Sequence, residues 1–108
     1  MTDAVSTARV ATATPGRYIA QLCKHFAHRI PTSYAPPTFE ATEGHIEFPD
    51  AGSCELRAEP GAFVLRVRAN DAATLHRLQD VVARHLERFA WREPPTFAWS
   101  AGVAETAR

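Results

Sequence analysis

The chain has 108 residues, of which 45% are hydrophobic and 22% charged, a composition typical of one soluble globular domain. Twelve Lys and Arg residues balance twelve Asp and Glu residues, so no net charge would draw the chain to nucleic acid or anionic lipid. No stretch approaches the roughly 18 to 20 apolar residues that span a bilayer, and the first residues lack the features of a signal peptide. We therefore expect a cytoplasmic protein with no nucleic-acid or membrane partner.

The first predicted elements are a strand and a long amphipathic helix. Thr7–Thr12 is short and partly β-branched, which favours a strand. Thr14 suits a helix cap, Pro15 suits the first helical position, and Pro31 should end the helix after Ile30. The apolar residues of this helix recur at three- and four-residue spacing, at Tyr18, Ile19, Leu22, Cys23, Phe26 and Ile30. The three prolines of Pro31–Pro37 predict a stiff loop.

Alternating apolar residues then predict a series of short strands. The inward residues are Phe39 and Ala41, then Ile46 and Phe48, then Cys54, Leu56 and Ala58, then Phe63, Leu65, Val67 and Ala69. Turns are expected between them at Glu43-Gly44, Pro49–Gly52 and Glu59–Gly61. The polar partners should share the opposite face, and they include His45, Glu47, Glu55, Arg57, Arg66 and Arg68. This pattern indicates an antiparallel meander with one buried and one wet face.

A second helix follows, capped by Asn70-Asp71. Its apolar face consists of Leu75, Leu78, Val82, Leu86 and Phe89. Pro94-Pro95 separates it from a last strand at Thr96–Trp99, and residues 101–108 are expected to be a frayed tail. Together these elements predict one α+β domain over residues 1–100. Its fold would be a two-layer sandwich, with a largely antiparallel sheet carrying two helices on one face, in the order β-α-β-β-β-(β)-α-β.

Chemistry-bearing residues concentrate on the two predicted helices. His25 and His28 are three residues apart on the first helix, a spacing at which both can face one ion. His85 on the second helix is the natural third ligand, so a zinc or iron site is one hypothesis. The alternative is that these histidines are structural, each half-buried and hydrogen-bonded to a neighbour. The row Arg84, Arg88 and Arg92 favours either an anion-binding ridge or a solvated face paired with nearby acids.

The cysteines and the polar sheet face leave two further functional hypotheses open. Cys23 and Cys54 are expected to be reduced and buried, because disulfides are rare in the cytoplasm and neither cysteine belongs to a CxxC motif. A small enzyme using Cys23 or His25 is one alternative. The other is an interaction or homodimerisation module using the uncovered sheet face. No nucleotide, flavin or catalytic signature is present, so the cofactor is unknown, with a metal ion left open.

The most distinctive segments of the chain are Leu22–Arg29, Gly44–Phe48, Cys54–Leu56, Val81–Glu93 and Phe97–Trp99. Together they resemble a bacterial family catalogued as domain of unknown function 2218, and the resemblance covers nearly the whole chain. Similar domains occur alone or joined to flavin-dependent siderophore-interacting reductases. The resemblance thus implies an accessory or binding domain in ferric-siderophore handling, whose partner would be such a reductase or the siderophore itself. Its expected polar contacts are His25, His28, His85, Arg88 and Arg92.

Overall fold

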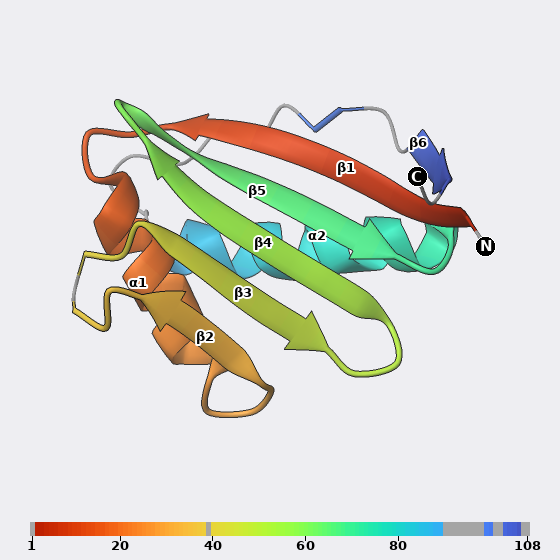
Figure 1. Ribbon diagram of the computed structural model, residues 1–108, viewed down its shortest axis with the longest axis horizontal. Coiled ribbons are helices and arrows are strands. Elements are labelled where there is room, and N and C mark those ends of the chain that lie inside the picture. The colour runs from red at the N-terminus through yellow and green to blue at the C-terminus, as the bar shows by residue number, and fades with distance from the viewer. Residues whose placement is uncertain (1, 39, 90–98, 101–102, 107–108) are drawn as a thin grey trace.

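The computed structural model describes residues 2–38, 40–89, 99–100 and 103–106. In chain order its elements are β1 (Thr2–Ala11), α1 (Pro15–Phe26), β2 (Thr32–Ala35), β3 (Glu43–Phe48), β4 (Gly52–Glu59), β5 (Ala62–Ala69), α2 (Ala72–Phe89) and β6 (Val103–Thr106). The strands form one antiparallel sheet in the order β2-β3-β4-β5-β1-β6. Both helices lie behind this sheet as Figure 1 views it. The predicted α+β class, with two helices on one face of an antiparallel sheet, is confirmed.

Two tight turns set the register of the central strands. The predicted turn after Phe48 forms, with Asp50 at a φ of 62°, and it pairs Phe48 with Gly52. The predicted turn at Pro60-Gly61 also forms, with Gly61 at a φ of 75°, and it pairs Glu59 with Ala62. Glycine tolerates this left-handed conformation because it has no Cβ. These registers place alternate residues of β3, β4 and β5 on the helix-facing side, as the sequence predicts.

Helix α1 is shorter than its apolar pattern predicts. It ends at Phe26, and a turn carries the chain on to Ile30, whose N–H still donates to the Phe26 carbonyl at 3.0 Å. Pro31 disfavours the helical conformation in the residue before it, which accounts for the unwound last turn. Pro15 occupies the first helical turn as predicted, but the Thr14 side chain makes no capping hydrogen bond.

Helix α2 begins as the sequence predicts. The Asp71 carboxylate accepts a hydrogen bond from the Thr74 backbone N–H at 2.7 Å, which satisfies one of the first free N–H groups of the helix. Its predicted inward residues are buried where the structure describes them, at Leu75, Leu78, Val82 and Leu86. The side chain of Phe89, the last residue predicted for this face, lies outside the described part.

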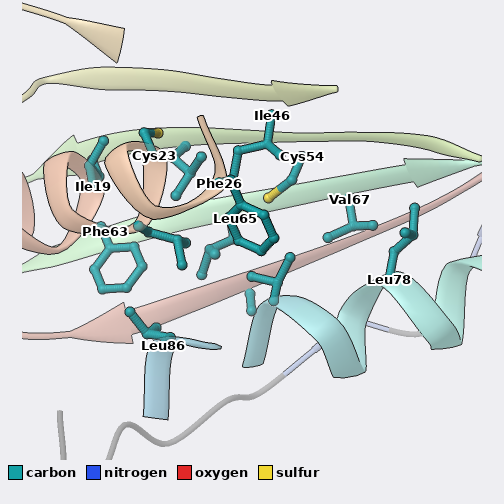
Figure 2. Close-up of a cluster of buried hydrophobic side chains, with 14 of the residues drawn as sticks. Ile19, Cys23, Phe26, Ile46, Cys54, Phe63, Leu65, Val67, Leu78 and Leu86 are labelled. Atoms are coloured by element: carbon teal, nitrogen blue, oxygen red, sulfur yellow. The ribbon is translucent and has the colours of Figure 1, made fainter. Parts of the chain in front are cut away.

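The core lies between the helices and the sheet. Helix α1 packs on β2, β3 and β4, while α2 packs chiefly on β5 and β1. Figure 2 shows the apolar side chains of both layers meeting there, with Ile19, Cys23 and Phe26 from α1 facing strand residues such as Ile46 and Cys54. Among the described residues, no helix is long and apolar enough to cross a membrane.

Several predicted elements differ from the structure. The expected Glu43-Gly44 turn is part of β3, and a Cβ on Gly44 would lie only 2.6 Å from the Cys23 Sγ atom. Gly44 therefore does not form a turn. Because it has no side chain, it lets α1 approach the sheet closely. The Pro31–Pro37 loop contains β2, which pairs with β3, whereas Ala41 lies outside any strand.

The predicted C-terminal features are only partly within the described residues. Most of the strand expected at Thr96–Trp99 lies outside them, but the N–H of Ser100 donates to the Thr7 carbonyl at 2.8 Å beside β1. The tail expected to fray after residue 100 contains β6, which pairs with the first residues of β1. Residues 103–106 form a strand because their backbone groups pair with the edge of β1 that would otherwise be free.

Candidate functional site

The two helices bring His25 and His85 together at one end of the helical layer. His25 lies in the last turn of α1, and His85 lies near the end of α2. Their ring centroids are 4.9 Å apart. The ring of Phe26 lies 4.8 Å from His85 and 5.7 Å from His25, so a buried aromatic side chain supports both imidazoles from the core. The predicted convergence of these two histidines is therefore present in the structure.

His85 is held in one orientation by its own helix. Its Nδ1 atom lies 2.6 Å from the Val81 carbonyl oxygen, one helical turn earlier. A carbonyl only accepts, so Nδ1 carries the hydrogen and donates it. In the neutral ring, Nε2 then keeps a free lone pair. This bond is the structural role predicted for His85. It leaves Nε2 as the ring nitrogen that can bind a ligand.

His25 is surrounded by groups that are cationic or become so on protonation. Partial burial lowers its pKa, and the nearby His85, Arg88, His28 and Arg29 lower it further. Each of these four described neighbours repels a proton, so together they contribute a positive potential at His25. We call this set, His25, His28, Arg29, His85 and Arg88, the basic cluster. The side chains of His25, His28, Arg29 and Arg88 are exposed, so an incoming ligand would meet them in solvent.

The remaining predicted site residues are placed as follows. His28 lies in the turn after α1, where it is exposed and helps to lower the pKa of His25. Arg84 is bound to Asp80 at 3.0 Å, so the expected arginine row is partly an ion-paired surface. Arg92 lies outside the described residues. Arg29 was not among the predicted contacts; its only signal in the sequence was its place in the same dense basic stretch as His25 and His28.

The described residues do not complete the metal site that the sequence suggested. Within the described ranges, no group of three or more His, Cys, Asp or Glu side chains is placed to hold a metal ion. His25 and His85 would supply two ligands, and protein zinc sites use three or four. A bare metal ion would thus need further ligands from water or from a bound molecule.

The cysteines are packing residues in this arrangement. Cys23 and Cys54 are both free thiols with no exposed surface, as predicted. Burial raises the pKa of Cys23 to about 12 and raises the pKa of Cys54 as well. The thiolate is the nucleophilic form of cysteine, so a buried thiol that stays protonated does not attack a substrate. The geometry therefore gives no support to an enzyme that uses Cys23.

The fold and the basic cluster together define a small α+β domain with a cationic end and no recognisable catalytic arrangement among its described residues. A model of the family described as "Uncharacterized protein conserved in bacteria (DUF2218)" matches residues 7–100. The chain belongs to this family. Its fold is similar to the NMR structure of PA4090 from Pseudomonas aeruginosa, with a TM-score of 0.70 and 36% sequence identity over 90% of this chain and 95% of that one. A search of curated proteins finds no match.

Proposed function

We propose that the domain is a cytoplasmic, non-catalytic binding module whose basic cluster holds an anionic small molecule. The supporting observation is the pairing of His25 with His85 from a second helix, with the positive charge of Arg88 also acting on His25. Imidazolium and guanidinium groups donate charge-assisted hydrogen bonds to carboxylate, phosphate and catecholate oxygens. The two free, buried thiols are compatible with a reducing compartment, which supports the cytoplasmic part of the proposal.

An anionic ferric siderophore is the ligand class that we assign to this site. The choice rests on the resemblance to domains joined to siderophore-interacting reductases, and the chemistry of the cluster is compatible with it. In such a complex the siderophore already occupies the coordination positions of the metal, so the protein needs no ligand set of its own. What remains to be recognised is the negative charge of the complex, which the basic cluster complements.

The test is a titration of the amide NMR spectrum with the gallium(III) complex of 2,3-dihydroxybenzoate, a diamagnetic stand-in for a ferric catecholate. We expect shifts to centre on residues 25–29 and 85–88. His25→Gln and Arg88→Gln should each weaken binding by about tenfold, the loss typical of one charge-assisted hydrogen bond. Arg84→Gln is the matched control, because Arg84 lies on the same helix but is engaged by Asp80. Affinity should rise as the pH falls below 6.5 toward the lowered pKa of His25, where its ring gains a proton.

Two further arms separate the alternatives. Metal-free 2,3-dihydroxybenzoate, with less negative charge, should bind more weakly than its complex. Zn²⁺ alone tests the three-histidine hypothesis: saturable binding that is lost in His28→Gln would establish a metal centre instead. Equal affinity of the gallium complex for the wild type, His25→Gln and Arg88→Gln would contradict the proposal.

A further inference from the structure

The face of the sheet that no helix covers carries many charged side chains. Figure 1 looks onto this face, with the strands in front and both helices behind. Alternate residues of each strand point outward, and the pairing of the strands aligns them in rows across the sheet. One row consists of His45, Glu55, Arg66 and Thr7, and the row beside it consists of Glu43, Arg57, Val64 and Arg9.

The charges on this face are divided between its two halves. Outward positions of β3 and β4 hold four carboxylates and one guanidinium group, at Glu43, Glu47, Glu55, Glu59 and Arg57. Outward positions of β5, and of residues 4–11 of β1 that pair with it, hold three guanidinium groups and no carboxylate, at Arg9, Arg66 and Arg68. One half is therefore negative and the other positive, although the chain as a whole has no net charge.

Ion pairing within the protein does not remove this division. Glu59 binds Arg9 at 2.8 Å and Arg57 at 3.2 Å, so these three groups offset one another at one end of the face. The other three carboxylates of the negative half, those of Glu43, Glu47 and Glu55, belong to exposed residues. A surface with one acidic and one basic half is complementary to a surface that has the same two halves in the opposite order.

A second copy of the chain presents such a surface. Identical subunits most often associate about a two-fold axis, which brings the same face of both chains together. If this axis runs parallel to the strands, between β4 and β5, each acidic half meets the basic half of the other chain. Glu55 then lies over Arg66 of the partner subunit, in the same row of the sheet. An axis that runs across the strands would place acidic on acidic side chains, so the charges select the first arrangement.

The extent of this face indicates a weak dimer. Four neighbouring strands are about 19 Å wide, and eight residues, the length of β4 and β5, extend about 27 Å. Such a face buries about 500 Å² per subunit, or about 1,000 Å² in total, which is the size of a transient interface. A cavity of about 630 Å³ in the face gives bridging water room between the two sheets. We expect a dissociation constant on the order of 100 μM that rises with salt.

We propose that the uncovered sheet face is the interface of a homodimer whose two-fold axis runs parallel to the strands. Its central contacts are two equivalent ion pairs, each between Glu55 of one chain and Arg66 of the partner subunit. The dimer does not depend on the proposed anion site, because the basic cluster lies in the helical layer behind the sheet and stays accessible.

The first test is sedimentation velocity of the wild type from about 10 μM to about 1 mM, a range that brackets the expected dissociation constant. At about 20 mM NaCl the average mass should rise toward that of two chains as the protein concentration increases. At about 500 mM NaCl the dimer should dissociate at least about tenfold more readily, because salt screens the pairs of exposed charges.

The second test exchanges the charges of the central pair. Glu55→Arg and Arg66→Glu, each alone, place like charges across the interface and should weaken the dimer at least about tenfold. An equimolar mixture of the two variants forms a heterodimer in which both central contacts again join an arginine to a glutamate. The mixture should therefore associate as the wild type does. Repulsion within one chain is not relieved by mixing, so this recovery reports on the contact between chains alone.

Arg77→Glu and Glu87→Arg are the matched controls, because they make the same changes of net charge at exposed positions of α2. They should leave the association unchanged. Three results would overturn the proposal. They are a wild type that stays monomeric at about 1 mM in low salt, a mixture that associates no better than its two components, or control variants that weaken association as much as Glu55→Arg does.

Discussion

At the scale of single residues, Gly44 shows how closely α1 rests on the sheet. A Cβ at this position would lie 2.6 Å from the Cys23 Sγ atom and 3.3 Å from the Ile19 Cγ2 atom. Both neighbours are fully buried, so neither has free space to move into. Overfilling a packed core in this way costs about 1–3 kcal/mol.

We therefore expect Gly44→Ala to lower the free energy of unfolding by about that amount, measured by urea denaturation. The control is the same substitution in a Cys23→Ala background, where the sulfur atom is gone. There its cost should be smaller, because the two positions are in contact. Strictly additive effects of the two substitutions would show that the contact does not limit the packing.

His25 provides a pH-dependent test at the same scale. Its pKa in the folded protein is lowered from 6.5 by burial and by its cationic neighbours, so the unfolded chain binds the proton more tightly. Its contribution to stability is then fully present above about pH 6.5 and is lost as the pH falls through the lower, folded value. His25→Gln should flatten this part of the profile of urea midpoint against pH.

His76→Gln is the comparison for this experiment, because His76 is an exposed histidine of the same protein in the first half of α2. It should leave the acid branch of the profile unchanged. Salt should reduce the His25 effect, because three of the repelling groups, His28, Arg29 and Arg88, are exposed and are screened by ions. A profile equally steep in wild type and His25→Gln would mean that other groups carry the pH dependence.

At the scale of elements, the beginning of α2 depends on Asp71. Its carboxylate accepts the Thr74 N–H, and this bond is the main cause of its lowered pKa. Asp71→Ala should lower the Tm, whereas Asp71→Asn should retain much of the stability, since asparagine also caps helices well. The contribution of Asp71 is present above its ordinary pKa of 3.8 and should disappear as the pH falls through the folded value. Thermal unfolding at pH 7 and pH 3 measures both effects.

The elements also show which local patterns predict structure. The alternation in β3, β4 and β5 and the apolar stripes of both helices were sufficient to predict their inward faces, because each pattern repeats within one segment. β2 was missed because it has four residues between Pro31 and Pro36, and it exists through pairing with β3. β6 likewise depends on β1, which lies at the other end of the chain. Such pairing leaves little local trace in the sequence.

The residues of the candidate site were likewise only partly predictable from the sequence. The approach of His25 to His85 was predictable, because both lie on flanks of helices whose inward faces were known. The partner of Arg57 was not predictable. It binds Glu59 on its own strand and not Glu43 opposite it, a side-chain choice that strand alternation does not specify. The polar residues of the outer sheet face themselves were identified from the sequence.

At the scale of the whole molecule, stability depends on the shared core. Leu86 is fully buried where α2 meets the sheet, and Leu22, Phe26, Leu65 and Val82 are buried with it, as predicted. Leu86→Ala should cost about 2–5 kcal/mol, a large part of the stability of a domain of this size. Arg84→Ala on the exposed side of the same helix should cost less than about 1 kcal/mol. Equal urea midpoints for these two variants would contradict the assigned packing of α2.

The position of β1 in the sheet has a consequence for synthesis of the protein. β1 begins at residue 2, but it lies between β5 and β6, and its pairing with β5 requires residues as far along as Ala69. On the ribosome, the backbone groups of β1 therefore stay unpaired by β5 until five further elements, α1, β2, β3, β4 and β5, have emerged. The hairpins of β3, β4 and β5 have short-range contacts and are able to form earlier. Translation speed through residues 43–69 thus governs how long this strand stays available to chaperones and to other nascent chains.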